Sequence, residues 1–467
     1  MSVDLVVLGA GPAGLAAAWR AAGTGRSVVV LERAAAVGGL AASFEVAGVR
    51  VDHGSHRLHP TTPPEIMANL RGLLGDDLQT RPRNGRLRVW GRWVGFPLVA
   101  GELVRTIPPV ALRRLARDAA CRPFRPRGGA SYGALLSNRL GPELYGELYA
   151  PYAEKLWGRT DVDAEQARVR VRAGSSAGLA LRALRGGRGS GRGRPGAKQG
   201  RVFHYPRRGF GQIVEALVDA ASAAGADIRL GTDITQVWPL EQRVRVLAGP
   251  AAIEARQVFS TVPLPVLATL LRPQASPAAL ADAAQLEFRA MVLVYLVHEG
   301  GRWSPYDAHY VPGLRTPITR VSEPANYRDS ADDPADRSVL CAEIPCAVGD
   351  RVWRASPDEL AALVAEGLAV TGLPPVRLAG VEVRRLPRVY PIYRVGYAQQ
   401  LAAVDALVAG ARNVTSFGRL GLFAHDNTHH ALAMAYDAVD ALRPDGSFDD
   451  VAWAAARQRF ATHVVED

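Results

Sequence analysis

Cysteine is scarce in this 467-residue chain, which has only Cys121, Cys341 and Cys346. An odd count without paired spacing argues against a disulfide framework and a cysteine zinc site, and it favours a reducing cytoplasm. Long apolar runs are also missing: no uncharged stretch reaches about 18 residues, which excludes a membrane-spanning helix on hydropathy. The first residues, MSVDLVVLGAG, start a strand without a preceding basic region, so we expect no signal peptide.

Acidic residues are fewer than basic residues, with 45 Asp and Glu against 56 Lys and Arg, and the formal net charge is +11. A good part of the excess lies in residues 181–201, LRALRGGRGSGRGRPGAKQGR, a Gly/Arg/Ser run without apolar periodicity. This composition predicts a flexible basic surface loop over residues 184–201. No aromatic residues interleave with its arginines, so we do not expect nucleic acid as a partner, while another anionic partner stays open.

Apolar sequence is plentiful, at 48% of residues, which is ample for a large buried core. Residues 3–8 and 27–33 are short, mostly apolar runs typical of buried parallel strands. Between them, GAGPAGLAAAWRAAG predicts a glycine turn followed by a helix. The order predicts a β-α-β unit.

Three glycines, Gly9, Gly11 and Gly14, occupy the turn of this unit. In a G-x-G-x-x-G turn the first glycine allows a tight bend, the second admits a pyrophosphate, and the third lets helix and strand pack closely. The amino end of the helix supplies N–H groups to the phosphates. Glu32 ends the second strand, where its carboxylate can accept hydrogen bonds from ribose hydroxyls. Together these features predict a dinucleotide site, for NAD or FAD.

Similar patterns return later in the chain. We expect strands at residues 227–230, 234–237, 257–262 and 413–417, and helices at residues 210–224 and 428–442. This return predicts a discontinuous nucleotide-binding domain, made of residues 1–63, 202–265 and 386–445. Residues 64–201 and 266–385 would form a substrate domain, largely helical to about residue 185 and with strands at residues 292–297 and 338–344.

The residues after Glu32 decide between the two cofactors. The segments ERAAAVGGLAASF, with its second glycine pair, and VDHGSHRLHP resemble the start of the protoporphyrinogen oxidase and flavin amine oxidase superfamily, which includes UDP-galactopyranose mutase. The resemblance implies FAD, held by a Rossmann-like domain of the two-dinucleotide-binding-domain flavoprotein type. The expected fold class is therefore α/β, with a mixed α+β substrate domain.

Residues 417–442, FGRLGLFAHDNTHHALAMAYDAVDAL, resemble the closing element of the same superfamily. By that resemblance Gly418 and Arg419 lie beside the flavin, and Asn427 and Thr428 cap a helix whose dipole favours the anionic reduced flavin. The expected cofactor-binding residues are Gly9, Gly11, Pro12, Ala13, Gly14, Glu32, Arg33, Gly38, Gly39, Leu40, Gly54, Ser55, Val237, Gly418, Arg419, Asn427 and Thr428.

Two histidines follow the Gly54–Ser55 turn, which the superfamily places near the flavin. His56 is a candidate proton acceptor, because histidine titrates near neutral pH, and a structural role is an equal alternative. His56 and Arg419 are therefore the candidate catalytic residues. The candidates for contact with the substrate are His59, Tyr393, Tyr397, Phe423 and His425.

A metal site is not expected, although His425, Asp426, His429 and His430 lie close in sequence. A helix cap at the flavin edge explains this group, and no distant partner ligand is evident. No cysteine lies beside this helix, so we also do not expect a thioether link to the flavin.

Two reactions fit the resemblance. The first is an FAD-dependent oxidoreductase that takes a hydride from a small organic substrate onto flavin N5. The second is a redox-neutral sugar isomerase similar to UDP-galactopyranose mutase, which uses reduced FAD. Arg419 in GRLG favours the mutase, but this chain has Phe423 and His425 where the mutase pattern has tyrosines for the diphosphate. The oxidoreductase is therefore the leading hypothesis.

A third class is a flavin-binding protein without turnover, or a membrane-surface protein. Residues 107–127, IPPVALRRLARDAACRPFRPR, mix apolar and basic residues on an expected helix. A solvated helix packed on its own domain is the simpler interpretation, and peripheral membrane contact is the alternative. We expect a cytoplasmic enzyme with a small-molecule substrate.

Overall fold

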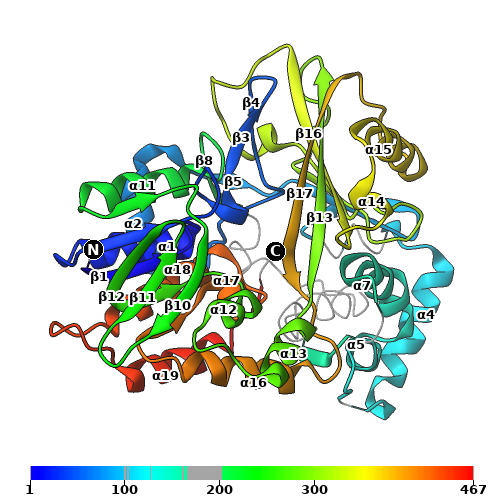
Figure 1. The fold of residues 1–467 in the computed structure, drawn as a ribbon. Helices are drawn as coiled ribbons and strands as arrows, with labels where there is room; N and C mark the ends of the chain where they lie inside the picture. Colours follow the sequence, from blue (N-terminus) through cyan, green and yellow to red (C-terminus); the bar gives the residue numbers. More distant parts are fainter. Residues whose placement is uncertain are drawn as a thin grey trace.

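The computed structural model describes residues 2–98, 101, 105–126, 128–159, 162–165 and 202–465, and the expected basic loop lies outside these ranges. Two seven-stranded sheets form the framework. Figure 1 shows the first sheet, with β1 and β12, at the left, and the second, with β13, β16 and β17, near the centre.

The first sheet has the strand order β10-β11-β12-β1-β2-β9, and β18 pairs with β12. The pairs that β1 forms with β2 and β12 are parallel, whereas β10, β11 and β12 are joined in antiparallel pairs. Its strands are β1 (Ser2–Leu8), β2 (Val28–Leu31), β9 (Asp227–Arg229), β10 (Ile234–Pro239), β11 (Val244–Ala248), β12 (Ala251–Ser260) and β18 (Val414–Ser416).

Helices cover both faces of this sheet. Leu5 and Val7 of β1 join one hydrophobic core, and Val6 and Leu8 join another, because successive side chains of a strand point to opposite faces. The helices of the first core are α1 (Pro12–Ala22), α2 (Pro64–Leu74), α11 (Gln212–Ala223), α18 (Thr428–Asp440) and α19 (Asp450–Phe460). Those of the second are α12 (Leu264–Leu270), α13 (Pro277–Gln285) and α16 (Tyr397–Ala409).

The second sheet has the order β17-β13-β16-β15-β14-β6-β7. Val292, Val294 and Leu296 of β13 pack with helix α15 (Pro357–Thr371), while Leu293 and Tyr295 face a separate core. Its strands are β6 (Gly85–Val89), β7 (Arg92–Phe96), β13 (Phe288–Glu299), β14 (Ala308–Tyr310), β15 (Arg320–Ser322), β16 (Arg337–Cys346) and β17 (Leu378–Pro391).

Smaller elements complete the chain. Two short antiparallel pairs join β3 (Ser43–Val46) to β4 (Val49–Asp52) and β5 (Leu78–Pro82) to β8 (Val202–Pro206). The helical block consists of α4 (Pro109–Cys121), η3 (Arg122–Phe124), α5 (Tyr132–Leu140), α6 (Pro142–Leu144), η4 (Tyr145–Tyr149) and α7 (Ala150–Trp157). Other short helices are η1 (Gly39–Ala41), η2 (Gly75–Asp77), η5 (Pro324–Tyr327), α14 (Arg351–Arg354) and α17 (Gly418–Gly421).

The expected α/β fold class with a Rossmann-like domain is confirmed by the first sheet and its helices. The largely helical stretch expected from residue 64 is wrong for residues 78–96, which form β5, β6 and β7. In β6 the residues alternate between buried and half-buried, a period of two where a helix has 3.6. The domain boundary expected at residue 386 falls inside β17.

Other expectations concern thiols and membrane spans. Cys121 is exposed, Cys341 and Cys346 are buried, and all three are free thiols. Within the described ranges, no helix has the length and apolar character needed to cross a membrane.

Candidate functional site

A cavity of about 580 Å³ opens at the carboxyl ends of β1 and β2. Ligands of open parallel α/β sheets bind at this edge. Its wall is shared between the glycine turn, the 53–57 turn, the start of α18 and strands β13, β16 and β17 of the second sheet. The expected site residues that line it are Gly9, Gly11, Pro12, Ala13, Glu32, Arg33, Gly39, Leu40, Gly54, Ser55, His56, His59, Gly418, Arg419, His425, Asn427 and Thr428.

The glycine turn is fixed by close contacts within the protein. Gly9 has a φ of +104°, and a Cβ on Gly14 would lie 2.0 Å from the carbonyl oxygen of Gly9. A Cβ on Gly11, in contrast, would meet no protein atom within 4 Å. Gly11 borders the cavity and is the N-cap of α1 without a side-chain cap, so the N–H groups of the first turn can meet a phosphate.

Glu32 is held at the end of β2 by two backbone N–H groups. Its Oε2 accepts a hydrogen bond from the N–H of Ala10, and its Oε1 accepts one from Ala34, both at 2.8 Å. Each carboxylate oxygen keeps a second lone pair, so the side chain can also accept ribose hydroxyls. Turn and carboxylate together fit the pyrophosphate and ribose of a dinucleotide.

The second glycine pair contacts the first turn. Gly38 has a φ of +108° and donates its N–H to the carbonyl of Ala10 at 2.8 Å. A Cβ on Gly39 would lie 3.8 Å from the Cα of Gly11. The two turns therefore form one continuous wall, as expected for a flavin dinucleotide.

Gly418 and Arg419 bring the closing element to the same wall. Gly418 has a φ of +81°, and a Cβ there would lie 3.2 Å from the Cβ of Ala13. The guanidinium of Arg419 donates to the carbonyls of Asp426 and Val389, at 2.9 and 2.8 Å. These bonds fix the loop that leads into α18, so the amino end of that helix borders the cavity.

His56 stands in the 53–57 turn, with its ring stacked on Phe210 at 5.2 Å. Burial lowers its pKa, so the ring is neutral at pH 7. Its Nε2 lies 3.1 Å from the carbonyl oxygen of His53 and donates to it, because that oxygen can only accept. The lone pair then remains on Nδ1, which can accept a proton.

Some expected site residues lie away from the cavity. Val237 is fully buried inside β10, on the face that packs on α12 and α16. Tyr393 and Tyr397 stack on each other with ring centroids 4.4 Å apart, and the hydroxyl of Tyr393 donates to the carbonyl of Phe423. The structure does not bring these aromatic side chains to the lining of the cavity; they pack with Phe423 at the second core of the first sheet.

The second sheet supplies site residues that the sequence analysis missed. Glu343 and Arg320 pair across β15 and β16 at 2.7 Å, and Arg83 reaches the cavity from the loop before β6. No local sequence motif marks these three residues, because only the tertiary fold brings them to the same cavity as the glycine turn. His53 was also missed; its place two residues before Ser55 was the available signal. The further residues of the lining include Arg57, Tyr152, Phe203, Met291, Leu293, Arg388 and Tyr390.

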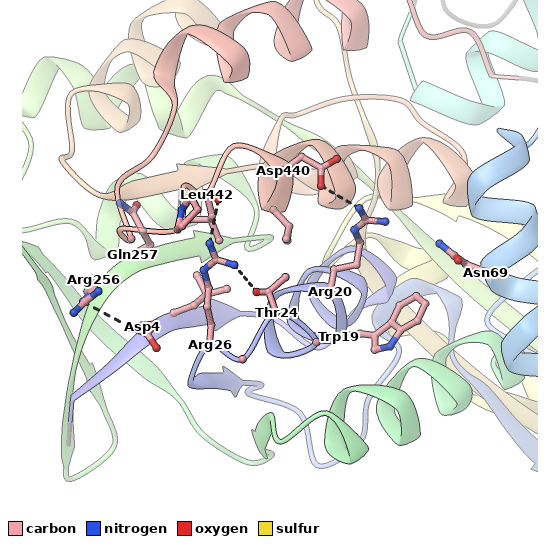
Figure 2. Close-up of a pocket in the computed structure, with 16 residues that line it drawn as sticks. Asp4, Trp19, Arg20, Thr24, Arg26, Asn69, Arg256, Gln257, Asp440 and Leu442 are labelled. Atoms are coloured by element: carbon pink, nitrogen blue, oxygen red, sulfur yellow. Dashed lines mark hydrogen bonds and ion pairs between the residues drawn. The ribbon is translucent and has the colours of Figure 1, made fainter.

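A second hollow, of about 860 Å³, lies at the opposite end of the first sheet (Figure 2). It is bounded by the start of β1 and by the last turns of α1 and α18. Parallel sheets bind ligands at the other edge. Its arginines already have partners: Arg20 contacts Glu65 and Asp440, Arg26 contacts Leu442 and Arg443, and Arg256 contacts Asp4. It is therefore not the cofactor site.

The histidine-rich start of α18 brings only some of its side chains together. Among the described residues one group brings metal-ligating atoms together, namely Asp426, His430 and His463, and it includes neither His425 nor His429.

The basic helix α4 buries Ala111 and Leu115, whereas Phe124 of the following η3 is 89% exposed.

Comparisons with known proteins agree with this geometry. Residues 7–73 match the family of NAD(P)-binding Rossmann-like domains. Residues 135–410, more than half of the chain, match the family of flavin containing amine oxidoreductases.

Relatives cover nearly the whole chain. A coproporphyrinogen III oxidase of Propionibacterium freudenreichii subsp. freudenreichii is 25% identical in an alignment 470 positions long that covers 87% of this chain and 85% of that protein. The structure of reduced UDP-galactopyranose mutase has a TM-score of 0.81 at 19% identity, covering 99% of this chain and 100% of the other. A protein described as a protoporphyrinogen oxidase, from Exiguobacterium sp. 255-15, has a TM-score of 0.70 at 20% identity, covering 94% and 98%. The two structures share this fold.

Proposed function

The chain belongs to the flavin-containing amine oxidoreductase family, and from this premise we propose that it uses FAD to oxidise a small organic substrate. Members of this family are enzymes that use a flavin and act on small molecules. When bound, FAD would supply a hydride acceptor at N5, and the residues of this chain would supply placement, proton transfer and exclusion of water.

One observation carries the assignment of FAD: a single cavity joins the glycine turn and Glu32 to the amino end of α18. The open space beside Gly11 suits a pyrophosphate, and Glu32 suits a ribose. At the other end of the same cavity, Gly418 and Arg419 would border the isoalloxazine. We propose that the FAD-binding domain consists of residues 1–63, residues 202–265 and the part of 386–445 that follows the end of β17 at Pro391.

His56 is proposed as the group that accepts the substrate proton. It borders the cavity, it is neutral at pH 7, and its lone pair resides on Nδ1. Arg419 is proposed to hold the flavin edge rather than to transfer a proton, because a guanidinium does not deprotonate in proteins.

The charges of the lining favour a substrate with a carboxylate or phosphate group. Arg83 borders the cavity, and one of its terminal nitrogens is buried without a hydrogen-bond partner in the described residues. Arg388 borders the same cavity. Guanidinium groups bind carboxylates and phosphates with paired hydrogen bonds. Oxidation of a porphyrinogen, the reaction named for the relative from Propionibacterium, is a candidate of this class.

The redox-neutral sugar isomerase is the second candidate, and it is favoured by Arg419, which borders the cavity. Against it, Phe423 is buried in the core, and His425 stacks on Tyr390 at 5.1 Å. Neither residue offers the pair of tyrosine hydroxyls that the mutase pattern has for the diphosphate.

Anaerobic mixing of the oxidised holoprotein with candidate substrates separates the two reactions. An oxidoreductase substrate bleaches the flavin absorbance, and its methyl ester bleaches it far more slowly if Arg83 binds the carboxylate. Isomerisation of a nucleotide sugar that requires prior reduction with dithionite, with no substrate bleaching the flavin, would replace the oxidoreductase by the mutase. Arg83→Ala should remove the difference between acid and ester.

A further inference from the structure

The carboxylate of Asp426 has one oxygen held by the protein and the other without a partner. Its side chain is 2% exposed, and it borders the cavity. Oδ1 lies 3.0 Å from Nδ1 of His430 and 3.2 Å from Nδ1 of His463. Oδ2 is buried and has no hydrogen-bond partner among the described residues. Native proteins pair nearly all buried polar atoms, so an unpaired oxygen at a cavity wall indicates a place for a ligand donor.

His463 is the imidazole that can hold this carboxylate without competition. The Nδ1 of His430 also lies 3.2 Å from the backbone N–H of Asn427, and one ring nitrogen cannot accept that hydrogen and donate to Asp426 together. Among the described residues, the Nδ1 of His463 faces only Asp426. It therefore donates to Oδ1 and fixes the direction of Oδ2.

The partner of Oδ2 must be a donor. Burial alone would raise the pKa of Asp426, but the neighbouring imidazoles of His430 and His463 outweigh burial and lower it. An ionised carboxylate only accepts hydrogen bonds. An O–H group of a ligand meets this need, and the ribityl chain of FAD is rich in such groups.

Helix α19 delivers His463 to this position. Arg457 pairs with Asp405 of α16 at 2.9 Å, and Arg459 pairs with Asp437 of α18 at 2.7 Å. Beyond the helix, the ring of His463 stacks on His430, with centroids 4.1 Å apart and planes at 14°. Two residues further on, Val465 borders the cavity. The segment 461–465 thus runs along the cavity wall.

We propose that His463, which follows helix α19, completes the flavin site as the positioning residue that aims Oδ2 of Asp426 at a hydroxyl of bound FAD. The proposal rests on the assignment of FAD above. It reaches beyond the family likeness, because the matched residues, 7–73 and 135–410, end well before this segment.

The test titrates the apoprotein with FAD and follows the quenching of flavin fluorescence. His463→Ala should raise the Kd for FAD about tenfold, the effect of losing a hydrogen bond to a charged group. His463→Asn, whose side-chain N–H can replace Nδ1–H, should restore the Kd to within about threefold of the wild type. Thr462→Ala, in the same segment, is the matched control and should leave the Kd unchanged. The melting temperature of the FAD-free protein should be the same for all three variants.

Each other outcome overturns the proposal. Wild-type affinity in His463→Ala, or no recovery in His463→Asn, would show that His463 does not position Asp426. If EDTA weakened FAD binding by the wild type to the level of His463→Ala, the cluster would be a metal site instead. A wild-type protein that binds no FAD would refute the proposed cofactor itself, which is a distinguishable failure.

Discussion

Glu343 accepts the backbone N–H of Ser55 at 2.8 Å through the same oxygen that receives the guanidinium of Arg320 at 2.7 Å. One carboxylate of β16 thereby joins the 53–57 turn of the Rossmann-like domain to the second sheet. The side chains of Glu343 and Arg320 are 5% and 15% exposed, so the pair is shielded from solvent.

Glu343→Ala should lower the free energy of unfolding of the apoprotein by about 3–5 kcal/mol, because it leaves the charge of Arg320 buried and unpaired. Urea denaturation followed by circular dichroism measures the change. The free energy of unfolding lost by the double variant Glu343→Ala/Arg320→Ala should be clearly smaller than the sum of the losses in the two single variants. Additive losses, within about 0.5 kcal/mol, would show that the two side chains are not coupled.

Gly11 and Gly14 should respond differently to the same substitution. Gly11→Ala should leave the melting temperature of the apoprotein unchanged and raise the Kd for FAD about ten- to a hundredfold, because its methyl group enters only the ligand space. Gly14→Ala should lower both stability and affinity, since its Cβ would meet the carbonyl of Gly9 at 2.0 Å. Calorimetry and flavin fluorescence measure the two effects.

Gly72→Ala is the matched control, because Gly72 lies in α2 and a Cβ there meets no atom within 4 Å. It should leave the Kd for FAD unchanged and raise the free energy of unfolding by about 0.5–1 kcal/mol. Unchanged FAD affinity in Gly11→Ala would contradict the placement of the pyrophosphate.

The glycine turn could be predicted because its geometry is local: strand, turn, helix and Glu32 lie within some thirty residues. The part of the cavity lining that would distinguish between substrates could not be predicted from the sequence. Arg83 reaches the cavity from the loop before β6 and Glu343 from β16, and no short motif encodes the places of these strands in the second sheet.

Tyr393 and Phe423 illustrate a second limit. Their segments lie beside the site as expected, but Phe423 has a φ of +51° and its ring lies in the core with the ring of Tyr393. Side-chain direction at such positions follows from backbone conformation, which the residue string does not determine. The alternation in β6 was available in the sequence, but its arginines obscured it.

Lys155 should make the free energy of unfolding depend on pH in the alkaline range. It is buried, its Nζ donates to the carbonyls of Val311 and Ile318, each at 2.8 Å, and burial lowers its pKa to about 7. A neutral amine has two N–H groups, which suffice for both carbonyls. Between pH 7 and the ordinary lysine pKa of 10.5, the unfolded chain binds more protons than the folded protein, so the free energy of unfolding rises with pH.

The slope that Lys155 contributes should reach about 1.4 kcal/mol per pH unit in the middle of this window. Urea denaturation at several pH values measures it as the difference between the wild type and Lys155→Met. Below pH 7 both states carry the proton, so the difference should become independent of pH. Parallel pH profiles above pH 7 for the two proteins would mean that Lys155 stays charged when folded.

Peripheral membrane contact is the alternative interpretation of the α4 surface, defined by Val110, Arg113 and Arg117 of α4 and Phe124 of η3. Val110 and Phe124 are 51% and 89% exposed, and both arginines face solvent. If this alternative holds, vesicles that contain phosphatidylglycerol carry the wild type upward in a flotation assay, and Phe124→Asp reduces the floated fraction; a helix that only packs on its own domain leaves both proteins unfloated. A wild type that does not float with the vesicles at low salt would rule out membrane contact by this surface.

The visible absorption spectrum of the purified protein, with acid release of its chromophore, tests the central claim most directly. The account predicts the bands of oxidised flavin and release of FAD, identified by chromatography against FMN. A colourless protein that takes up no added FAD would contradict it, as would a chromophore released as FMN. A colourless protein that binds NAD instead would assign the glycine turn and Glu32 to a nicotinamide cofactor.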